Sequence, residues 1–316
     1  MHWFVDNLYE VYREAERYLE KRAAGMPHHE SLRQSPASGH GAKPSSDTVR
    51  PEPSDGQIIF SVKGGDKKFK KKGDGKYVEI LPTDVHKFDD LIVDKGFERG
   101  STVLISGGAG TGKTTFALQS LYHRANKGER GIFISFEEEP EKIMMHMKKN
   151  YGWDFEELRK KKLVDVIKFD PTKIARSVEE SILSRTGALR IDFRQLELPF
   201  LPDRVVVDSL SALSIAFEDE EYYRKYIRLL FEALESLGSI NFVITETEQD
   251  PEVYSRTGVE EFLADGVIVL YNMKVNRKRE NALEILKLRS SKHEKRMVPY
   301  TITSKGIDIS VNKRGD

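Results

Sequence analysis

Cysteine is absent from this 316-residue chain, which excludes both a disulfide framework and a thiolate metal site. Net charge is absent too, because 51 basic and 51 acidic side chains cancel, so the total charge does not point to a polyanionic partner. No stretch approaches the roughly 20 apolar residues of a membrane-spanning helix. Asp6 and Glu10 interrupt the apolar core that a signal peptide would need. We therefore expect no membrane span and, by default, a cytoplasmic location.

The composition that remains fits one large α/β domain with an appendage. Hydrophobic residues make up 38% of the chain, which is enough for the core of such a domain at this length. Residues 1–24 predict an amphipathic helix, because apolar side chains recur there at spacings of four and three. These side chains are Phe4, Leu8, Val11, Ala15 and Tyr18. The helix either docks on its own domain or binds a protein partner, for example as a short coiled coil.

Two segments separate this helix from the main domain. Residues 25–57 are rich in Pro, Ser, Gly and His, which predicts a flexible linker. Residues 58–77 form a basic lead-in, with strand-like runs at 58–62 and 77–81 around five lysines between 67 and 72. This pattern predicts a hairpin with a charged tip. A solvated loop is favoured over a nucleic-acid contact there, because Phe69 is the only aromatic residue among the lysines.

Residues 78–316 alternate strand-like and helical segments, which predicts a mostly parallel central sheet flanked by helices. After residue 281 short strands follow one another, which predicts an antiparallel C-terminal extension of the sheet. Strands are expected at 102–106, 131–136, 163–169, 204–208, 240–245 and 265–271, helices at 113–127, 140–151, 175–189 and 220–237, and the C-terminal strands at 282–288, 297–302 and 306–309.

A phosphate-binding motif stands between the first of these strands and the first helix. The pattern G-x-x-x-x-G-K-[ST] is matched by Gly107, Gly108, Ala109, Gly110, Thr111, Gly112, Lys113 and Thr114. Backbone N–H groups of such a loop converge on phosphates, and the following helix adds its N-terminal partial charge. We expect Lys113 to reach the β- and γ-phosphates of ATP, Thr114 to bind Mg²⁺, and Thr115 to add a phosphate contact. Residues 107–115 are called the cradle below.

Carboxylates follow two other predicted strands. Asp208 ends the apolar run 205–207, which predicts a ligand that holds Mg²⁺ through water at the carboxyl edge of the sheet. Glu137, Glu138 and Glu139 follow the strand 131–136. A carboxylate there, beside the cradle, could orient or deprotonate an attacking water. Three adjacent acidic residues could equally be a solvated charge run, and the residues alone leave both interpretations open.

Several motifs in one order resemble the KaiC family of ATPases in the RecA superfamily. They are FDDLI at 88–92, GS at 100–101, FEE at 136–138, GVEEF at 258–262, LKLR at 286–289, His293, and YTIT at 300–303 followed by Gly306 and Ile307. The resemblance covers roughly 77–310 and implies a RecA-like P-loop NTPase fold with a single KaiC domain of the archaeal type.

The resemblance implies roles for residues that the pattern alone leaves open. Glu137 and Glu138 match the glutamate pair that activates the hydrolytic water. Lys287 and Arg289 match cations that reach the γ-phosphate of a neighbouring subunit, and His293 matches a further nucleotide contact. Two residues apart on a strand, both cations would project from one face. The family further implies a homo-oligomeric ring, expected as a hexamer, with ATP between subunits.

The sequence also departs from the family pattern. The turn at 93–96 lacks the usual glycine run, and the segment 190–203 is an insertion without an assigned place. Glu261 and Phe262 stand where the autophosphorylating half of KaiC has a Ser-Thr pair, so self-phosphorylation is not expected there.

Three hypotheses for function follow. The first is a ring-forming regulatory or motor ATPase with ATP and Mg²⁺. The second is a nucleotide-gated assembly scaffold with negligible hydrolysis. The third, a recombinase-like DNA-binding ATPase, is not favoured, because the net charge is zero.

Overall fold

The structure is a computed structural model that describes residues 61–62, 79–183, 197–247, 254–255, 257–275 and 277–310. The chain divides into two compact units, 1–54 and 55–316, and every described residue belongs to the second. The predicted N-terminal helix at 1–24, the linker at 25–57 and the lysine-rich part of 58–77 lie outside the described residues. Within these residues, no helix is long and apolar enough to cross a membrane.

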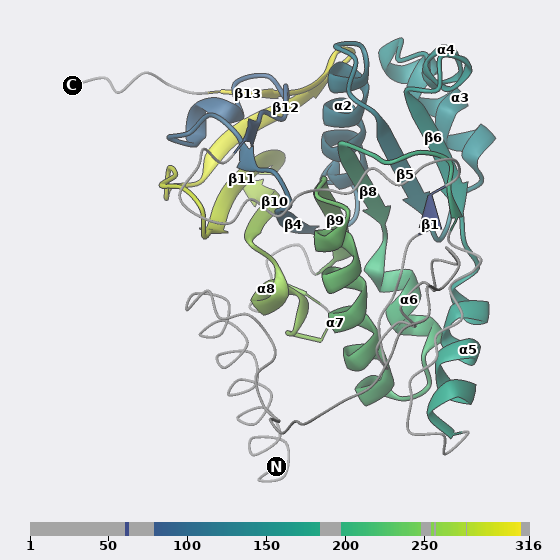
Figure 1. Ribbon diagram of the computed structural model, residues 1–316. Coiled ribbons are helices and arrows are strands. Elements are labelled where there is room, and N and C mark those ends of the chain that lie inside the picture. The colour runs from purple at the N-terminus through teal and green to yellow at the C-terminus, as the bar shows by residue number, and fades with distance from the viewer. Residues whose placement is uncertain are drawn as a thin grey trace, which may run out of the picture. The chain divides into compact units, whose positions relative to one another are not determined.

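Within the described ranges, nine strands form one sheet in the order β13-β12-β11-β10-β4-β9-β8-β5-β6 (Figure 1). The six strands from β10 to β6 are parallel, and β11, β12 and β13 continue the sheet in antiparallel pairing. The bounds are β4 Thr102–Gly107, β5 Gly131–Ser135, β6 Val164–Lys168, β8 Arg204–Asp208, β9 Ile240–Glu246, β10 Gly266–Val275, β11 Lys278–Leu288, β12 Val298–Thr303 and β13 Gly306–Ile309.

Helices cover both faces of the sheet and make it the middle of three layers (Figure 1). Successive side chains of β4 alternate between two buried clusters, because neighbours on a strand point to opposite faces. Val103 and Ile105 pack with α2 and α3, whereas Leu104 packs with α5, α6 and α7. The helices are α2 Lys113–Ala125, α3 Pro140–Tyr151, α4 Phe155–Lys160, α5 Pro171–Leu183, α6 Leu210–Ala216, α7 Glu220–Ser236 and α8 Glu260–Leu263, with a 3-10 turn, η1, at Asp89–Leu91.

The predicted mostly parallel sheet with its antiparallel C-terminal extension is confirmed. Local differences remain: the short helices α4, α6 and α8 were not predicted, and some elements differ in their bounds. Helix α5 begins four residues before the predicted start, because Asp170 accepts from the N–H of Thr172 and Pro171 occupies the first turn. Strands β10 and β11 extend past the predicted 265–271 and 282–288 as a two-stranded ribbon, since β10 pairs with β4 only as far as Leu270. The ribbon was not predicted because its sequence is polar and shows no hydrophobic pattern.

Two minor pairings involve the predicted hairpin runs. The strand β1, Ser61–Val62, pairs in parallel with β7, Glu197–Leu198. The strand β2, Ile80–Leu81, pairs with β3, Phe97–Glu98. The described parts of the two runs thus pair with other strands rather than with each other. The pairing of β7 also gives the end of the 190–203 insertion a partner, while 184–196 lies outside the described residues.

Candidate functional site

The cradle occupies the sharp connection between β4 and α2. Gly107 has φ +151° and Gly112 has φ +89°, both in the range that favours glycine. A Cβ on Gly107 would lie 2.3 Å from the carbonyl oxygen of Leu270, and a Cβ on Gly112 would lie 2.8 Å from Cδ1 of Ile302. At Gly107 the backbone therefore passes so close to that of β10 that only glycine fits, whereas at Gly112 the positive φ is the main reason for glycine.

Lys113 is folded back over the loop that it follows. Its Nζ donates a 3.0 Å hydrogen bond to the carbonyl of Gly108 and lies 3.7 Å from Oε1 of Glu246. Burial lowers the pKa of Lys113, and the carboxylates of Glu246 and Asp208 oppose that effect. The side chain is 7% exposed, so it presents a concentrated positive charge inside the site.

Thr114 and Asp208 meet at the start of α2. The hydroxyl of Thr114 donates a 2.6 Å hydrogen bond to Oδ2 of Asp208. Burial raises the pKa of Asp208 to about 6; the charge of Glu137 adds to the rise, and the hydrogen bond from Thr114 opposes it. A charged ligand near Asp208 would therefore act on a carboxyl group that is already poised to change its protonation near neutral pH.

These two oxygens suit a hard cation. A hydroxyl and a carboxylate are ligands that Mg²⁺ prefers, and Mg²⁺ usually takes few protein ligands together with phosphate oxygens and waters. In the described part of the chain, no group of three or more His, Cys, Asp or Glu side chains is placed to hold a metal ion. The donor set of Thr114 and Asp208 therefore fits an ion that arrives with a nucleotide.

Glu137 and Glu138 follow β5, which lies beside β8 and not beside the cradle strand β4. The expected position of this strand next to the cradle was wrong, since β9 and β8 intervene. Glu137 nevertheless accepts a 2.8 Å hydrogen bond from the hydroxyl of Ser209, the residue after Asp208. The backbone of Glu138 is fixed by Ser135, whose hydroxyl both accepts from its N–H and donates to its carbonyl.

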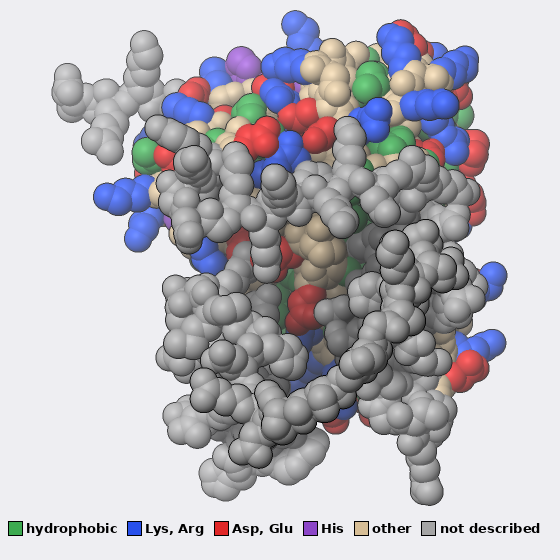
Figure 2. All heavy atoms as spheres, viewed as in Figure 1, with side chains coloured by type: hydrophobic (Ala, Val, Ile, Leu, Met, Phe, Trp, Pro, Cys, Tyr) green, Lys and Arg blue, Asp and Glu red, His purple; other side chains and the backbone are tan. Residues whose placement is uncertain are grey.

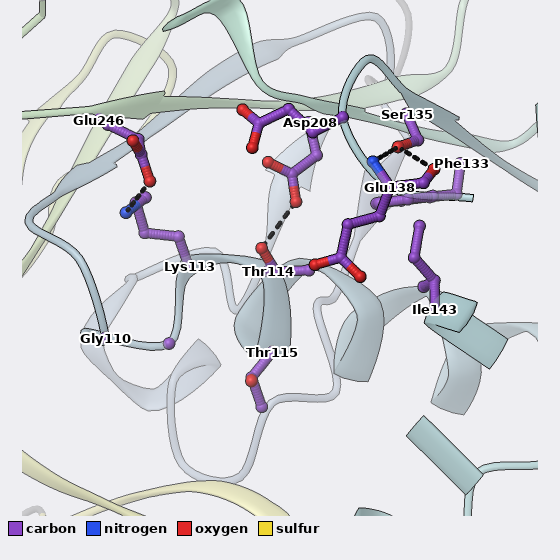
Figure 3. A pocket seen from close by; sticks show the side chains of 12 residues that line it. Gly110, Lys113, Thr114, Thr115, Phe133, Ser135, Glu138, Ile143, Asp208 and Glu246 are labelled. Atoms are coloured by element: carbon purple, nitrogen blue, oxygen red, sulfur yellow. Dashed lines mark hydrogen bonds and ion pairs between the residues drawn. The ribbon is translucent and has the colours of Figure 1, made fainter. Parts of the chain in front are cut away.

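Side chains of the cradle, of Asp208 and of the two glutamates line one cavity of about 290 Å³ (Figure 3). Figure 3 shows Lys113 directed at Glu246, Thr114 directed at Asp208, and Thr115 pointing away from Asp208. The lining residues are Gly110, Gly112, Lys113, Thr114, Thr115, Phe133, Ser135, Glu137, Glu138, Ile143, Asp208 and Glu246. The carboxyl ends of β4, β9, β8 and β5 thus deliver the predicted cradle, metal and water residues to one place.

Glu246 was missed by sequence reasoning, although a signal for it was present. It follows the apolar run 240–245 as Asp208 follows 205–207. The strand β9 lies between β4 and β8, and Glu246 is in register with Gly107. At both Asp208 and Glu246, an acidic residue at the end of a buried parallel strand therefore indicated a residue of the site.

The cradle connects to a second cavity, of about 500 Å³, through Thr115. The hydroxyl of Thr115 lies 3.2 Å from that of Tyr151, and Tyr151 and Trp153 line the second cavity with their rings stacked at 4.5 Å between centroids. The other lining residues come from α2, β12, β13, the β12–β13 turn and the segment after β2: His86, Gln119, His123, Thr303, Lys305, Ile307 and Asp308.

Lys287 and Arg289 lie away from the first cavity, the one at the cradle. Their side chains donate to carbonyl groups at the end of α8, Lys287 to that of Glu261 at 2.9 Å and Arg289 to that of Phe262 at 2.7 Å. Neither residue lines the cavity of its own chain.

His293 is also outside the cavity and forms an isolated bridge with Ile92. Within the described residues its Nδ1 is buried without a hydrogen-bond partner. The turn at 93–96, which departs from the expected pattern, packs here, because the N–H of Val93 donates to the carbonyl of Lys292.

Comparison with known proteins adds three findings. The family model described as "ATPase: KaiC" matches residues 81–314. The chain is similar to the circadian clock oscillator protein KaiC of Acaryochloris marina, with 32% identity over 242 residues, and to the circadian clock protein KaiC3 of Synechocystis sp., with 33% over 233 residues. These matches cover 76% and 73% of this chain but 46% of each relative, so the chain spans about half the length of the curated relatives it matches.

Among solved structures, the chain is similar to the KaiC-like protein PH0186 from the hyperthermophilic archaeon Pyrococcus horikoshii OT3. The TM-score is 0.62 at 31% sequence identity, and the match covers 74% of this chain and 100% of that chain.

Proposed function

The chain belongs to the KaiC family of ATPases, and from that premise we propose that it binds ATP with Mg²⁺ in the cavity at the cradle and hydrolyses it. The observation that carries this proposal is the meeting of Lys113, Thr114, Asp208, Glu137 and Glu138 in one cavity. Cradle, cation ligands and a candidate base are the parts that phosphoryl transfer to water requires.

Each part has a defined task in this proposal. The N–H groups of the cradle and the first turn of α2 hold the phosphates, and Lys113 neutralises charge at the β- and γ-positions. Thr114 and Asp208 would hold Mg²⁺, and the ion would supply further charge neutralisation on the transferring group. Glu137 and Glu138 orient the attacking water and accept its proton. Ser209 and Ser135 position these two glutamates.

The second cavity supports a place for the base of the nucleotide. Thr115 joins the cradle to Tyr151, a partly buried ring that is backed by the buried ring of Trp153 and lines this cavity. Planar heterocycles bind well to such aromatic surfaces. In this arrangement the phosphates lie over the start of α2 and the base lies further along that helix, beside Gln119 and His123.

Lys287 and Arg289 have a task in the proposal only if subunits associate. Family membership supports a homo-oligomeric ring, expected as a hexamer, in which both cations approach the γ-phosphate bound by a neighbour. A guanidinium in that position would stabilise charge on the transferring phosphoryl group. His293 would add a contact from the same side. A partner for the predicted N-terminal helix and a cytoplasmic location stay predictions.

Phosphate release from the purified protein with Mg²⁺ and ATP tests the proposal. The Glu137→Gln/Glu138→Gln variant is expected to bind ATP and to lose turnover, because the water then lacks a base. Glu139→Gln is the matched control, since Glu139 pairs with Lys168 and does not line the cavity. Full activity of the double variant would contradict the water-activation roles.

The same assay separates the scaffold hypothesis from the ATPase. A scaffold would change its oligomer size with ATP while phosphate release stays negligible, so size with and without ATP is measured beside turnover. The DNA-binding hypothesis gains nothing from the surface seen in Figure 2, where basic and acidic side chains are interspersed over the described residues. The lysines at 67–72 lie outside the described residues, and salt-dependent DNA binding that needs them would revive it.

A further inference from the structure

Glu246 is held in place by its backbone on both sides. Its N–H donates a 2.8 Å hydrogen bond to the hydroxyl of Ser211 at the start of α6. The N–H of the next residue, Thr247, donates at 3.2 Å to the carbonyl of Gly107, the first residue of the cradle. The side chain of Glu246 therefore starts from a fixed point at the edge of the phosphate cavity.

From that point Glu246 reaches the cation that the phosphates need. Its Oε1 lies 3.7 Å from Nζ of Lys113, and Figure 3 shows the two side chains directed at each other. Lys113 is 7% exposed, whereas Glu246 is 54% exposed. The lysine is thus confined, and the glutamate is free to swing toward solvent. The pair joins the first turn of α2 to the carboxyl end of β9.

The charges that line the cavity make this contact consequential. Among the described residues, four carboxylates line it, those of Glu137, Glu138, Asp208 and Glu246, against one cation, Lys113. Among the four, Glu246 forms an ion pair with Lys113. Glu137 is held by Ser209, Glu138 lies 3.6 Å from Lys142, and Asp208 accepts from Thr114.

We propose that Glu246 is an internal competitor of the terminal phosphate for Lys113. This inference rests on the proposed ATP binding at the cradle. Without nucleotide, the Glu246 carboxylate fills the space beside Nζ of Lys113 on the side of the carboxyl end of β9. Binding of ATP brings a γ-phosphate to that space, so the carboxylate must leave Lys113 and move toward solvent. When the phosphate departs, Glu246 returns to Lys113 and again opposes phosphate binding.

The competition predicts a selective effect of removing the charge. Glu246→Gln keeps the size of the side chain and removes both the ion pair and the repulsion toward the γ-phosphate. We expect the affinity for a triphosphate to rise roughly three- to tenfold, as fits a half-exposed charge a few ångströms away. The affinity for ADP should rise less, because ADP leaves the γ-position empty. A purely structural role of Glu246 would not change the ratio of the two affinities in this direction.

The experiment is an equilibrium titration of the full chain with Mg²⁺ and either ADP or the β,γ-imido analogue of ATP. Wild type is compared with Glu246→Gln and Glu246→Ala, and with Glu139→Gln as a charge-matched control outside the cavity. The expected result is tighter analogue binding in both Glu246 variants, a higher ratio of analogue to ADP affinity, and no change in the control.

The outcomes distinguish this proposal from the proposed function. Unchanged or weaker analogue binding in the Glu246 variants, with binding intact in wild type, would overturn the competitor role alone. Equal gains for analogue and ADP would also overturn it, since the γ-position would then be irrelevant. Absence of binding in folded wild type would overturn the proposed function and this inference with it.

Discussion

Arg289 offers the sharpest test of the arrangement between subunits, because it cannot serve the cradle of its own chain. Its N–H donates at 2.9 Å to the carbonyl of Asp265, and the N–H of Asp265 donates at 2.7 Å to the carbonyl of Thr102. Arg289 is therefore tied to the start of β4, whereas the cradle begins at its end, Gly107. Five steps of about 3.3 Å separate Thr102 from Gly107, or about 16 Å, which exceeds the reach of an arginine side chain.

The perturbation is a pair of variants mixed in one preparation. Arg289→Ala keeps an intact cradle, and Lys113→Ala keeps an intact Arg289. Each variant alone is expected to lose phosphate release. If equal amounts mix at random in a ring, about one quarter of the interfaces combine an intact cradle with an intact Arg289. The mixture should then recover up to about one quarter of wild-type turnover.

The assay is phosphate release from the two variants alone and after co-assembly, with subunit exchange confirmed by mass measurement of differently tagged chains. Arg296→Ala is the matched control, since Arg296 contacts Glu294 on an exposed segment and should keep full activity. Arg289→Lys separates loss of charge from loss of the contact with α8. Confirmed mixing without any recovery would refute the reasoning that Arg289 acts on a neighbour.

Two further predictions concern stability. Asp208→Asn should stabilise the nucleotide-free protein at pH 8 but not near pH 4, while it weakens Mg²⁺-dependent ATP binding. Burial raises the pKa of Asp208 from an ordinary 3.8 to about 6. The contribution of this carboxyl group to stability is therefore present below pH 4 and lost as pH rises through 6. Above that range, replacement by a neutral residue should raise the free energy of unfolding by up to about 3 kcal/mol. Chemical unfolding at both pH values checks this, and equal stability of both proteins at pH 8 would contradict it. Glu129→Gln should destabilise the fold by about 3 kcal/mol or more. It removes the carboxylate that lies 3.2 Å from the guanidinium of Arg204, a side chain only 1% exposed. A shift of the thermal midpoint of less than a degree or two would contradict this prediction.

The prediction of the sheet was correct where the strands and helices are buried, because their apolar residues follow a regular pattern. It was incomplete where the chain extends beyond the core. The ribbon that extends β10 and β11 is polar because the rest of the sheet does not continue beside it, so no periodic pattern announced it. Helix α4 was missed because it is short, although Asp154 accepts from the N–H of Glu157, a capping signal that the sequence contained.

The cradle could be predicted in full because its glycines, lysine and threonine are contiguous in the sequence. The roles of Glu137 and Glu138 could be predicted only from the family resemblance, since three adjacent acidic residues do not by themselves indicate which of them faces the site. Their meeting with Asp208 depends on strand order, which pairs β5 with β8. Glu246 depends on the same order, because only the insertion of β9 between β4 and β8 brings its carboxylate to Lys113.

The proposed function depends on nucleotide binding at the cradle, and one titration tests that binding directly. Fluorescent ATP is titrated into folded wild type and into Lys113→Ala, each with Mg²⁺ and with a chelator. We expect saturable, Mg²⁺-dependent binding to wild type that is lost or much weakened in Lys113→Ala. Wild type that is folded yet shows no affinity for ATP, or a Lys113→Ala variant that binds as well as wild type, would contradict it.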